Sequence, residues 1–134
     1  VNMLDTAAHF YDTYECGDGK FISIGSIEPQ FYALLREKLG LTDDPSFDAQ
    51  MDKAQWPVLK EKLAAIFKSQ PRAHWDALMQ GTDVCYGPIV SMAEALEHPH
   101  NVARGTFFKL DGADQPFPAP RFEGTPSAVP VARK

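Results

Sequence analysis

The stretch KFISIGSIEPQFY, residues 20–32, contains the change of periodicity that decides the fold. Its first half alternates between the two faces of an extended chain, with Phe21, Ser23 and Gly25 on one face and Ile22, Ile24 and Ser26 on the other. Pro29 suits the first turn of an α-helix, where its missing N–H is not needed. The stretch therefore predicts a β-strand that turns into a helix at Glu28.

The sequence before this stretch predicts a second strand. Residues 9–16, HFYDTYEC, are rich in aromatic and β-favouring side chains. Gly17-Asp18-Gly19 follows as a turn signal, so the two strands should pair as an antiparallel hairpin. The hairpin and the start of the first helix share an aromatic group that we interpret as core packing: Tyr11, Tyr14, Phe21, Phe31 and Tyr32.

The sequence after this stretch predicts helices. Apolar residues recur at helical spacing in three segments, which are residues 31–39, 56–67 and 71–80. Their expected buried positions are Phe31, Leu34, Leu35 and Leu39 in the first, Leu59, Leu63, Ile66 and Phe67 in the second, and Trp75, Leu78 and Met79 in the third. Gly40 and Gly81 are natural C-terminal stops.

Residues 84–110 should contain two further strands and two short helices. Residues 84–90 read as extended, and Pro88 makes them either an edge strand or a segment outside the sheet ladder. Ser91 to Glu94 has the capping-box pattern of a helix start, and a second helical turn is expected from Pro99 to Gly105. Residues 106–110, TFFKL, predict a strand that Asp111-Gly112 closes.

Five prolines after Gln115 prevent a continuous helix. We therefore predict an α+β fold, in which a small antiparallel β-sheet packs against several α-helices and an extended proline-rich tail follows. The expected division is a small domain over residues 1–115 and a tail over residues 116–134 that lies on another part of the protein.

Composition excludes several classes of function. The net charge is −5 and basic residues are scattered, so no nucleic-acid partner is expected. No apolar run approaches the 20 or so residues of a membrane span, so no membrane partner is expected either. Cys16 and Cys85 have neither metal nor redox spacing and are interpreted as free buried thiols. His98 and His100 lack a third ligand nearby, so we expect no metal.

Glu28 is the candidate functional residue that the pattern itself singles out. A carboxylate between a strand and a helix start faces the positive end of the helix dipole and free backbone N–H groups. These groups favour its ionised form. An ordinary acidic residue at a helix start explains the same pattern, so the residues alone leave both interpretations open.

Several motifs, in order along nearly the whole chain, resemble α-methylacyl-CoA racemases of the family III CoA-transferase fold. The resemblance rests on YDTYECGDGK (residues 11–20), IGSIEPQFY (24–32), Trp56-Pro57, GTDVC (81–85) with Pro88, HPHN (98–101) with ARGTF (103–107), and PAPRF (118–122). The run at residues 7–10, AAHF, departs from the Gly-Ala-Pro-like sequence that is usual at this point. The chain also begins Val1-Asn2-Met3, which is typical of a fragment or a processed chain.

The resemblance implies an isomerase. Such enzymes epimerise the α-carbon of 2-methylacyl-CoA thioesters by 1,1-proton transfer through an enolate-like intermediate. Their proton-transfer histidine and aspartate lie in a larger upstream domain, so this chain alone should be inactive. Glu28 matches the glutamate that orients the catalytic histidine. Tyr11 matches a position near the same pocket, and Ile27 and Pro29 are substrate-contact candidates by adjacency.

The family also implies partners and a compartment. Acyl-CoA is the substrate and no separate cofactor is expected. The full-length protein should be an interlocked homodimer of fatty acid and lipid metabolism, cytoplasmic in a bacterium and peroxisomal or mitochondrial in a eukaryote. Two alternatives stay open: the small domain of a family III CoA-transferase, or a non-catalytic interaction module that uses its hairpin face.

Overall fold

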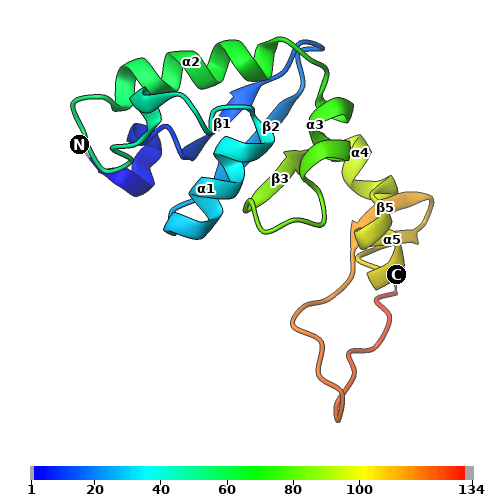
Figure 1. Ribbon diagram of the computed structural model, residues 1–134. Coiled ribbons are helices and arrows are strands. Elements are labelled where there is room, and N and C mark those ends of the chain that lie inside the picture. The colour runs from blue at the N-terminus through cyan, green and yellow to red at the C-terminus, as the bar shows by residue number, and fades with distance from the viewer. Residues whose placement is uncertain (1, 132–134) are drawn as a thin grey trace. The chain divides into compact units, whose positions relative to one another are not determined.

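The computed structural model describes residues 2–131 and separates into two compact units (Figure 1). Unit 1 extends to Ile89 and unit 2 begins at Val90. The predicted α+β class is confirmed, because helices in unit 1 accompany a small antiparallel sheet. The predicted boundary between residues 115 and 116 concerned the place of the tail in a larger protein, and it stays a prediction.

Unit 1 is built around a three-stranded sheet in the order β1-β2-β3. The strands are β1 (Tyr11–Glu15), β2 (Phe21–Gly25) and β3 (Tyr86–Ile89), and both pairings are antiparallel. Tyr11 pairs with Gly25, as the predicted hairpin requires, and Gly19 supplies the positive φ of +76° in its turn. Pro88 lies in edge strand β3, as predicted.

Five helical segments accompany this sheet. They are η1 (Met3–Ala7), α1 (Pro29–Lys38), η2 (Pro45–Phe47), α2 (Trp56–Lys68) and α3 (Arg72–Met79). The three α-helices were predicted. The turns η1 and η2 were not, because each is too short to show a helical period. Instead, a side chain at the start of each turn stabilises it, since Asn2 accepts from the Leu4 N–H and Asp44 from the Ser46 N–H.

The alternation of β2 and the apolar stripe of α2 meet in the core. Ile22 and Ile24 are buried and the intervening Ser23 is half-buried. On α2 the buried residues are Trp56, Leu59, Leu63 and Phe67. The Phe67 ring lies 5.1 Å from the Tyr14 ring of β1 and 5.2 Å from the Trp75 ring of α3. Ile66 and Leu78 were expected to be inward and are half-buried, because they lie at the margins of their stripes.

A second group of rings joins the N-terminal segment to α1, η2 and α2. His9 is fully buried, and its Nε2 lies 2.8 Å from the Tyr32 hydroxyl, which donates to the Phe47 carbonyl at 3.0 Å. No neighbour in sequence marks this contact, because Tyr32 lies 23 residues away from His9. His9 Nδ1 is buried without a hydrogen-bond partner among residues 2–131.

Acid should weaken unit 1 through His9. Burial lowers the pKa of His9 from 6.5 to about 4. Below pH 6.5 the unfolded chain therefore binds a proton that the folded chain does not, so the free energy of unfolding decreases as the pH is lowered. We expect His9 to account for a loss of about 3 kcal/mol between pH 6.5 and pH 4.

Urea unfolding of the chain at several pH values, followed by tryptophan fluorescence, measures this contribution, because both tryptophans lie in unit 1. A His9→Gln chain should lose correspondingly less stability over the same interval. His100→Gln, at an exposed position, is the control and should keep the wild-type slope. Equal slopes for the wild type and His9→Gln would contradict the assignment.

Unit 2 contains two short helices and a separate hairpin. They are α4 (Met92–Glu97), α5 (Pro99–Arg104), β4 (Phe107–Leu110) and β5 (Ala113–Pro116). The predicted capping box is present, since Ser91 and Glu94 exchange side-chain and backbone hydrogen bonds. Strand β5 was not predicted, because ADQP has no β-favouring pattern and forms a strand only by pairing with β4. None of the described residues 90–131 is fully buried.

The tail after β5 contains no helix or strand through residue 131. Arg121 anchors it, because its guanidinium lies 4.8 Å from the centre of the Phe117 ring and donates to the Arg104 carbonyl at the end of α5. Arg121 therefore caps the C-terminal end of α5. Across residues 2–131, no helix is both long enough and apolar enough to cross a membrane.

Candidate functional site

Glu28 lies at the corner between β2 and α1, as predicted, but its local geometry differs from the expectation. Strand β2 ends at Gly25, two residues earlier than expected. Glu28 is the N-cap of α1 in an extended conformation, and its carbonyl accepts from the N–H groups of Phe31 and Tyr32, each at 3.0 Å.

The carboxylate of Glu28 does not cap the helix. Its side chain is exposed and makes no capping hydrogen bond within the described chain. The expected contact with helix N–H groups is therefore absent, and two local causes explain it. Pro29 removes the first N–H, and glutamate is one methylene longer than the Asp side chain that fits this geometry well. The carboxylate is thus available to a partner from outside.

Hydrogen bonds fix the backbone of the corner, although none caps α1 through the Glu28 carboxylate. The Ser26 N–H donates to the Phe10 carbonyl at 3.0 Å, and the Ser26 hydroxyl donates to the Val84 carbonyl at 2.5 Å. The Gln50 side-chain amide donates to the carbonyls of Ser26 and Ile27. Three segments distant in sequence therefore fix the residues immediately before Glu28.

Tyr11 lies near the corner, on the opposite strand from Gly25. Both Tyr11 and Cys85 border Gly25, because a Cβ placed on Gly25 would lie 3.5 Å from the Tyr11 ring and 3.9 Å from Cys85 Cβ. They share a cavity of about 310 Å³, which is lined by Thr6, Tyr11, Asp12, Thr13, Ser23, Ile24, Gly25 and Cys85.

Ile27 and Pro29, the other two candidates, lie on either side of Glu28 in different environments. Ile27 is half-buried and packs against the core. Pro29 is exposed at the first position of α1. Ile27 therefore supports the corner from inside, whereas Pro29 shares the solvent-facing side with Glu28. Whether either contacts substrate stays a prediction.

Cys85 is a site residue that sequence reasoning missed. It was interpreted as a buried thiol, and it is exposed, whereas Cys16 is buried as predicted. The backbone of Cys85 is left-handed, with a φ of +58°, which no apolar pattern in the sequence reveals. Partial desolvation of the sulfur and the negative charges of Glu28 and Asp83 raise the pKa of the Cys85 thiol, which keeps it protonated at neutral pH.

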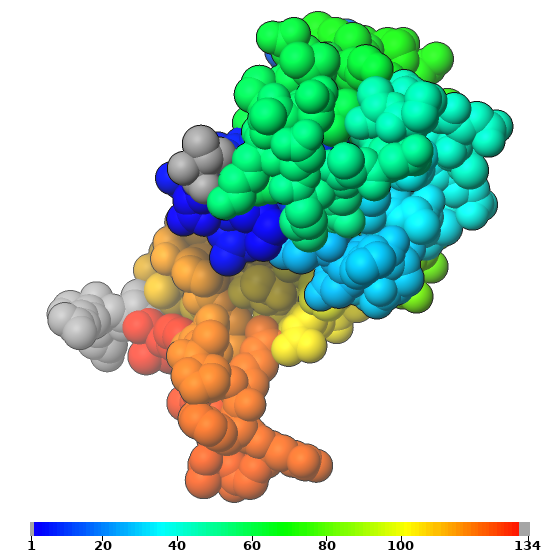
Figure 2. Space-filling model, turned by 60° about the vertical axis from the view of Figure 1, so that its left-hand side comes forward, coloured from blue at the N-terminus to red at the C-terminus, as the bar shows by residue number. Residues whose placement is uncertain are grey.

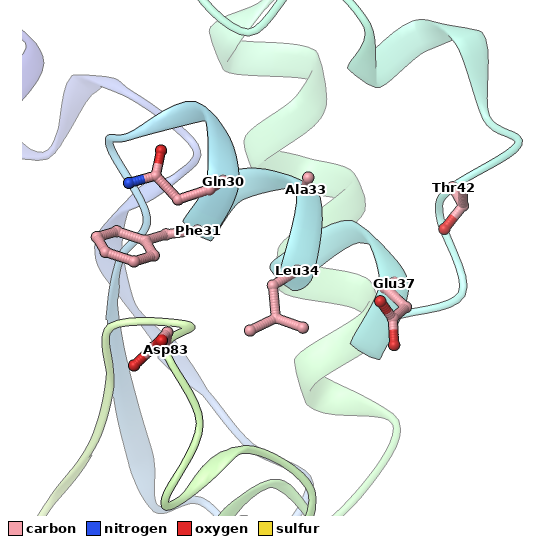
Figure 3. A pocket seen from close by; sticks show the side chains of 7 residues that line it. All are labelled: Gln30, Phe31, Ala33, Leu34, Glu37, Thr42 and Asp83. Atoms are coloured by element: carbon pink, nitrogen blue, oxygen red, sulfur yellow. The ribbon is translucent and has the colours of Figure 1, made fainter.

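A larger cleft of about 590 Å³ begins two residues after Glu28 and follows α1. Phe31 and Leu34 project from α1 on the side of the loop that carries Asp83 (Figure 3). The other lining residues are Gln30, Ala33, Glu37 and Thr42. Phe31 and Leu34 were predicted to be core residues and are half-buried, so part of this stripe faces the cleft.

Metal ligation has no support in residues 2–131, because nowhere in that range do three His, Cys, Asp or Glu side chains gather in a possible metal site. What the corner offers instead is an exposed carboxylate on a fixed backbone, beside a neutral thiol and a tyrosine. Such a carboxylate can accept a hydrogen bond from an imidazole and stabilise its charged form.

Comparison with known proteins identifies the family to which this fold belongs. The model of CoA-transferase family III matches residues 2–133, and the chain therefore belongs to this family. The chain is 44% identical over 135 residues to alpha-methylacyl-CoA racemase from Mus musculus and 43% identical over 134 residues to alpha-methylacyl-CoA racemase from Homo sapiens. Each alignment covers 99% of this chain and 35% of the relative, so the chain spans about a third of the length of these relatives.

A solved structure has the same fold. The crystal structure of the hypothetical protein Rv3272 from Mycobacterium tuberculosis matches with a TM-score of 0.75 and covers 94% of this chain and 36% of that one. The sequence identity is 17%, so this likeness concerns the fold alone. The resemblance inferred from the motifs is confirmed at the level of the family and of its racemase members.

Proposed function

We propose that this chain is the C-terminal portion of an acyl-CoA racemase that epimerises the α-carbon of 2-methylacyl-CoA thioesters. The observation that carries the proposal is the exposed Glu28 carboxylate on a backbone held from three sides. The identity of 44% to a protein named alpha-methylacyl-CoA racemase supports the substrate class.

The reaction would require two proton-transfer groups from the rest of the protein. One removes the α-proton of the thioester, which leaves an enolate-like intermediate, and the other returns a proton to the opposite face. By the family pattern these groups are a histidine and an aspartate upstream. Glu28 would accept a hydrogen bond from that histidine, fix its ring orientation and stabilise the imidazolium that forms on proton abstraction.

The position of Glu28 suits this role. An imidazole from another domain can reach the carboxylate because no described group of the chain occupies it through a capping bond. Tyr11 and the Cys85 thiol, which share a cavity beside the corner, would face the same ligand. The full-length protein would function as a homodimer in lipid metabolism, with acyl-CoA as substrate and no separate cofactor.

Hydrogen–deuterium exchange at the α-carbon tests the proposed function. In D₂O, the full-length protein should exchange the α-proton of a (2R)-2-methylacyl-CoA and scramble its configuration without an acceptor acid. The 134-residue chain alone should show no exchange, because it lacks the proton-transfer pair. A full-length protein that instead moves CoA to a free carboxylate and leaves the α-proton in place would be a CoA-transferase, and the proposal would be wrong.

A further inference from the structure

Gln50 lies in the loop between η2 and α2 and makes two hydrogen bonds to the Glu28 corner. Its side-chain amide donates to the Ser26 carbonyl at 3.1 Å and to the Ile27 carbonyl at 2.9 Å. A primary amide has two N–H donors, so both are used on consecutive carbonyls immediately before Glu28. These two bonds connect the corner to a loop more than 20 residues away in sequence.

Gln50 is itself fixed. Its backbone carbonyl accepts from the Trp56 indole N–H at 2.8 Å. Trp56 is 1% exposed and packs edge-on against Phe10 with 5.9 Å between ring centres. Figure 2 shows the N-terminal segment, the start of α1 and the loop before α2 adjacent on one face of unit 1. The two bonds from Gln50 therefore start from a rigid base.

The two hydrogen bonds from Gln50 act as a clamp on the corner, which matters because the Glu28 side chain has no capping bond of its own. The position of its carboxylate depends on the backbone of residues 25–27, and Ser26 provides the second clamp through its bond to the Val84 carbonyl. A shift of about 1 Å at a catalytic group can cost on the order of a hundredfold in rate. We propose that Gln50, together with Ser26, is a positioning residue that sets Glu28 for the reaction, an inference that rests on the proposed function.

The substitution Gln50→Glu in the full-length protein tests the clamp. The side chain keeps its length and shape, but a carboxylate cannot donate to the two carbonyls. We expect kcat for α-proton exchange to fall about tenfold and KM to change less than about twofold, because a misplaced Glu28 affects the transition state more than substrate binding. Gln50→Met, which lacks the donors but adds no charge, should give the same fall.

Two controls separate positioning from general damage. Gln55→Glu adds the same charge at an exposed position in the same loop and should leave the exchange rate unchanged. In a Glu28→Gln background, Gln50→Glu should have no further effect on kcat, because residues that act through one group are not additive. Far-UV circular dichroism and tryptophan fluorescence check that each variant folds.

Each outcome has a distinct meaning. If the Gln50 variants keep the wild-type kcat while Glu28→Gln lowers the exchange rate about a hundredfold, the positioning role of Gln50 is contradicted and the proposed function stands. If the Gln50 substitutions lower kcat equally in the Glu28→Gln background, the positioning role is also contradicted, because Gln50 then does not act through Glu28. If Glu28→Gln alone leaves exchange unchanged, the role of Glu28 in the proposed function fails. Should neither Gln50 variant fold, Ser26→Ala replaces them in the same cycle with the same expectations.

Discussion

Glu28→Gln in the full-length protein is expected to lower the rate of α-proton exchange by about a hundredfold or more. The amide keeps the size of the side chain and one acceptor oxygen but loses the negative charge. An imidazolium that forms during proton abstraction would lose the charge that stabilises it, and the orientation of the ring would be less well fixed. Since the Glu28 side chain is exposed and makes no capping bond, the substitution should leave the fold of unit 1 intact.

Single-turnover exchange in D₂O, followed by NMR or mass spectrometry, measures this effect directly. Glu61→Gln, at an exposed position on α2, provides the matched control and should keep the wild-type rate. The expected loss should appear in kcat and kcat/KM alike, because the interaction is made in the transition state. A Glu28→Gln enzyme with the rate of the wild type would show that the corner carboxylate has no part in the chemistry.

Phe67→Ala should destabilise unit 1 by about 4 kcal/mol. Phe67 is 0% exposed and lies between the rings of Tyr14 and Trp75, so it joins the sheet to α2 and α3. Removing the ring loses its transfer free energy and leaves a cavity that three rigid elements cannot easily close. A loss of this size is a large fraction of the total stability of a small domain.

Urea unfolding of the chain followed by tryptophan fluorescence measures this loss as a shift of the transition midpoint. Val58→Ala is the control, because Val58 lies on the same helix and is 52% exposed. Its expected effect is below about 0.5 kcal/mol. A loss below about 1 kcal/mol for Phe67→Ala would mean that the contacts between α2 and the sheet are not the principal source of stability in unit 1.

The elements that the sequence predicted correctly are those with a repeated local pattern. The alternation at residues 21–26, the helical stripe of α2 and the capping box at Ser91 each involve neighbours a few residues apart, and each is found in the structure. Strand β5 has no such pattern and was missed. The exposure of Cys85 was missed because its positive φ has no local signal, and the Gly25 N–H that donates to its carbonyl lies 60 residues away.

The candidate site divides in the same way. Glu28 could be singled out from the sequence because it lies where a strand pattern meets the proline of a helix start, and its role was implied by the resemblance to the racemases. Gln50 could not, since a glutamine in a polar loop has no local feature that points to a carbonyl more than 20 residues away. The cleft along α1 was likewise hidden, because Phe31 and Leu34 fit a buried stripe as well as a cleft wall.

By itself, therefore, the sequence determined the family, the α+β class and the place of the corner carboxylate, because periodicity, turn residues and ordered motifs are properties of adjacent residues. Only the tertiary structure decided which groups hold that corner, that the Glu28 carboxylate faces outward without capping α1, and that His9 is buried against Tyr32. Those outcomes depend on contacts between segments far apart in the chain, and the free energy of such contacts exists only once the segments have packed together.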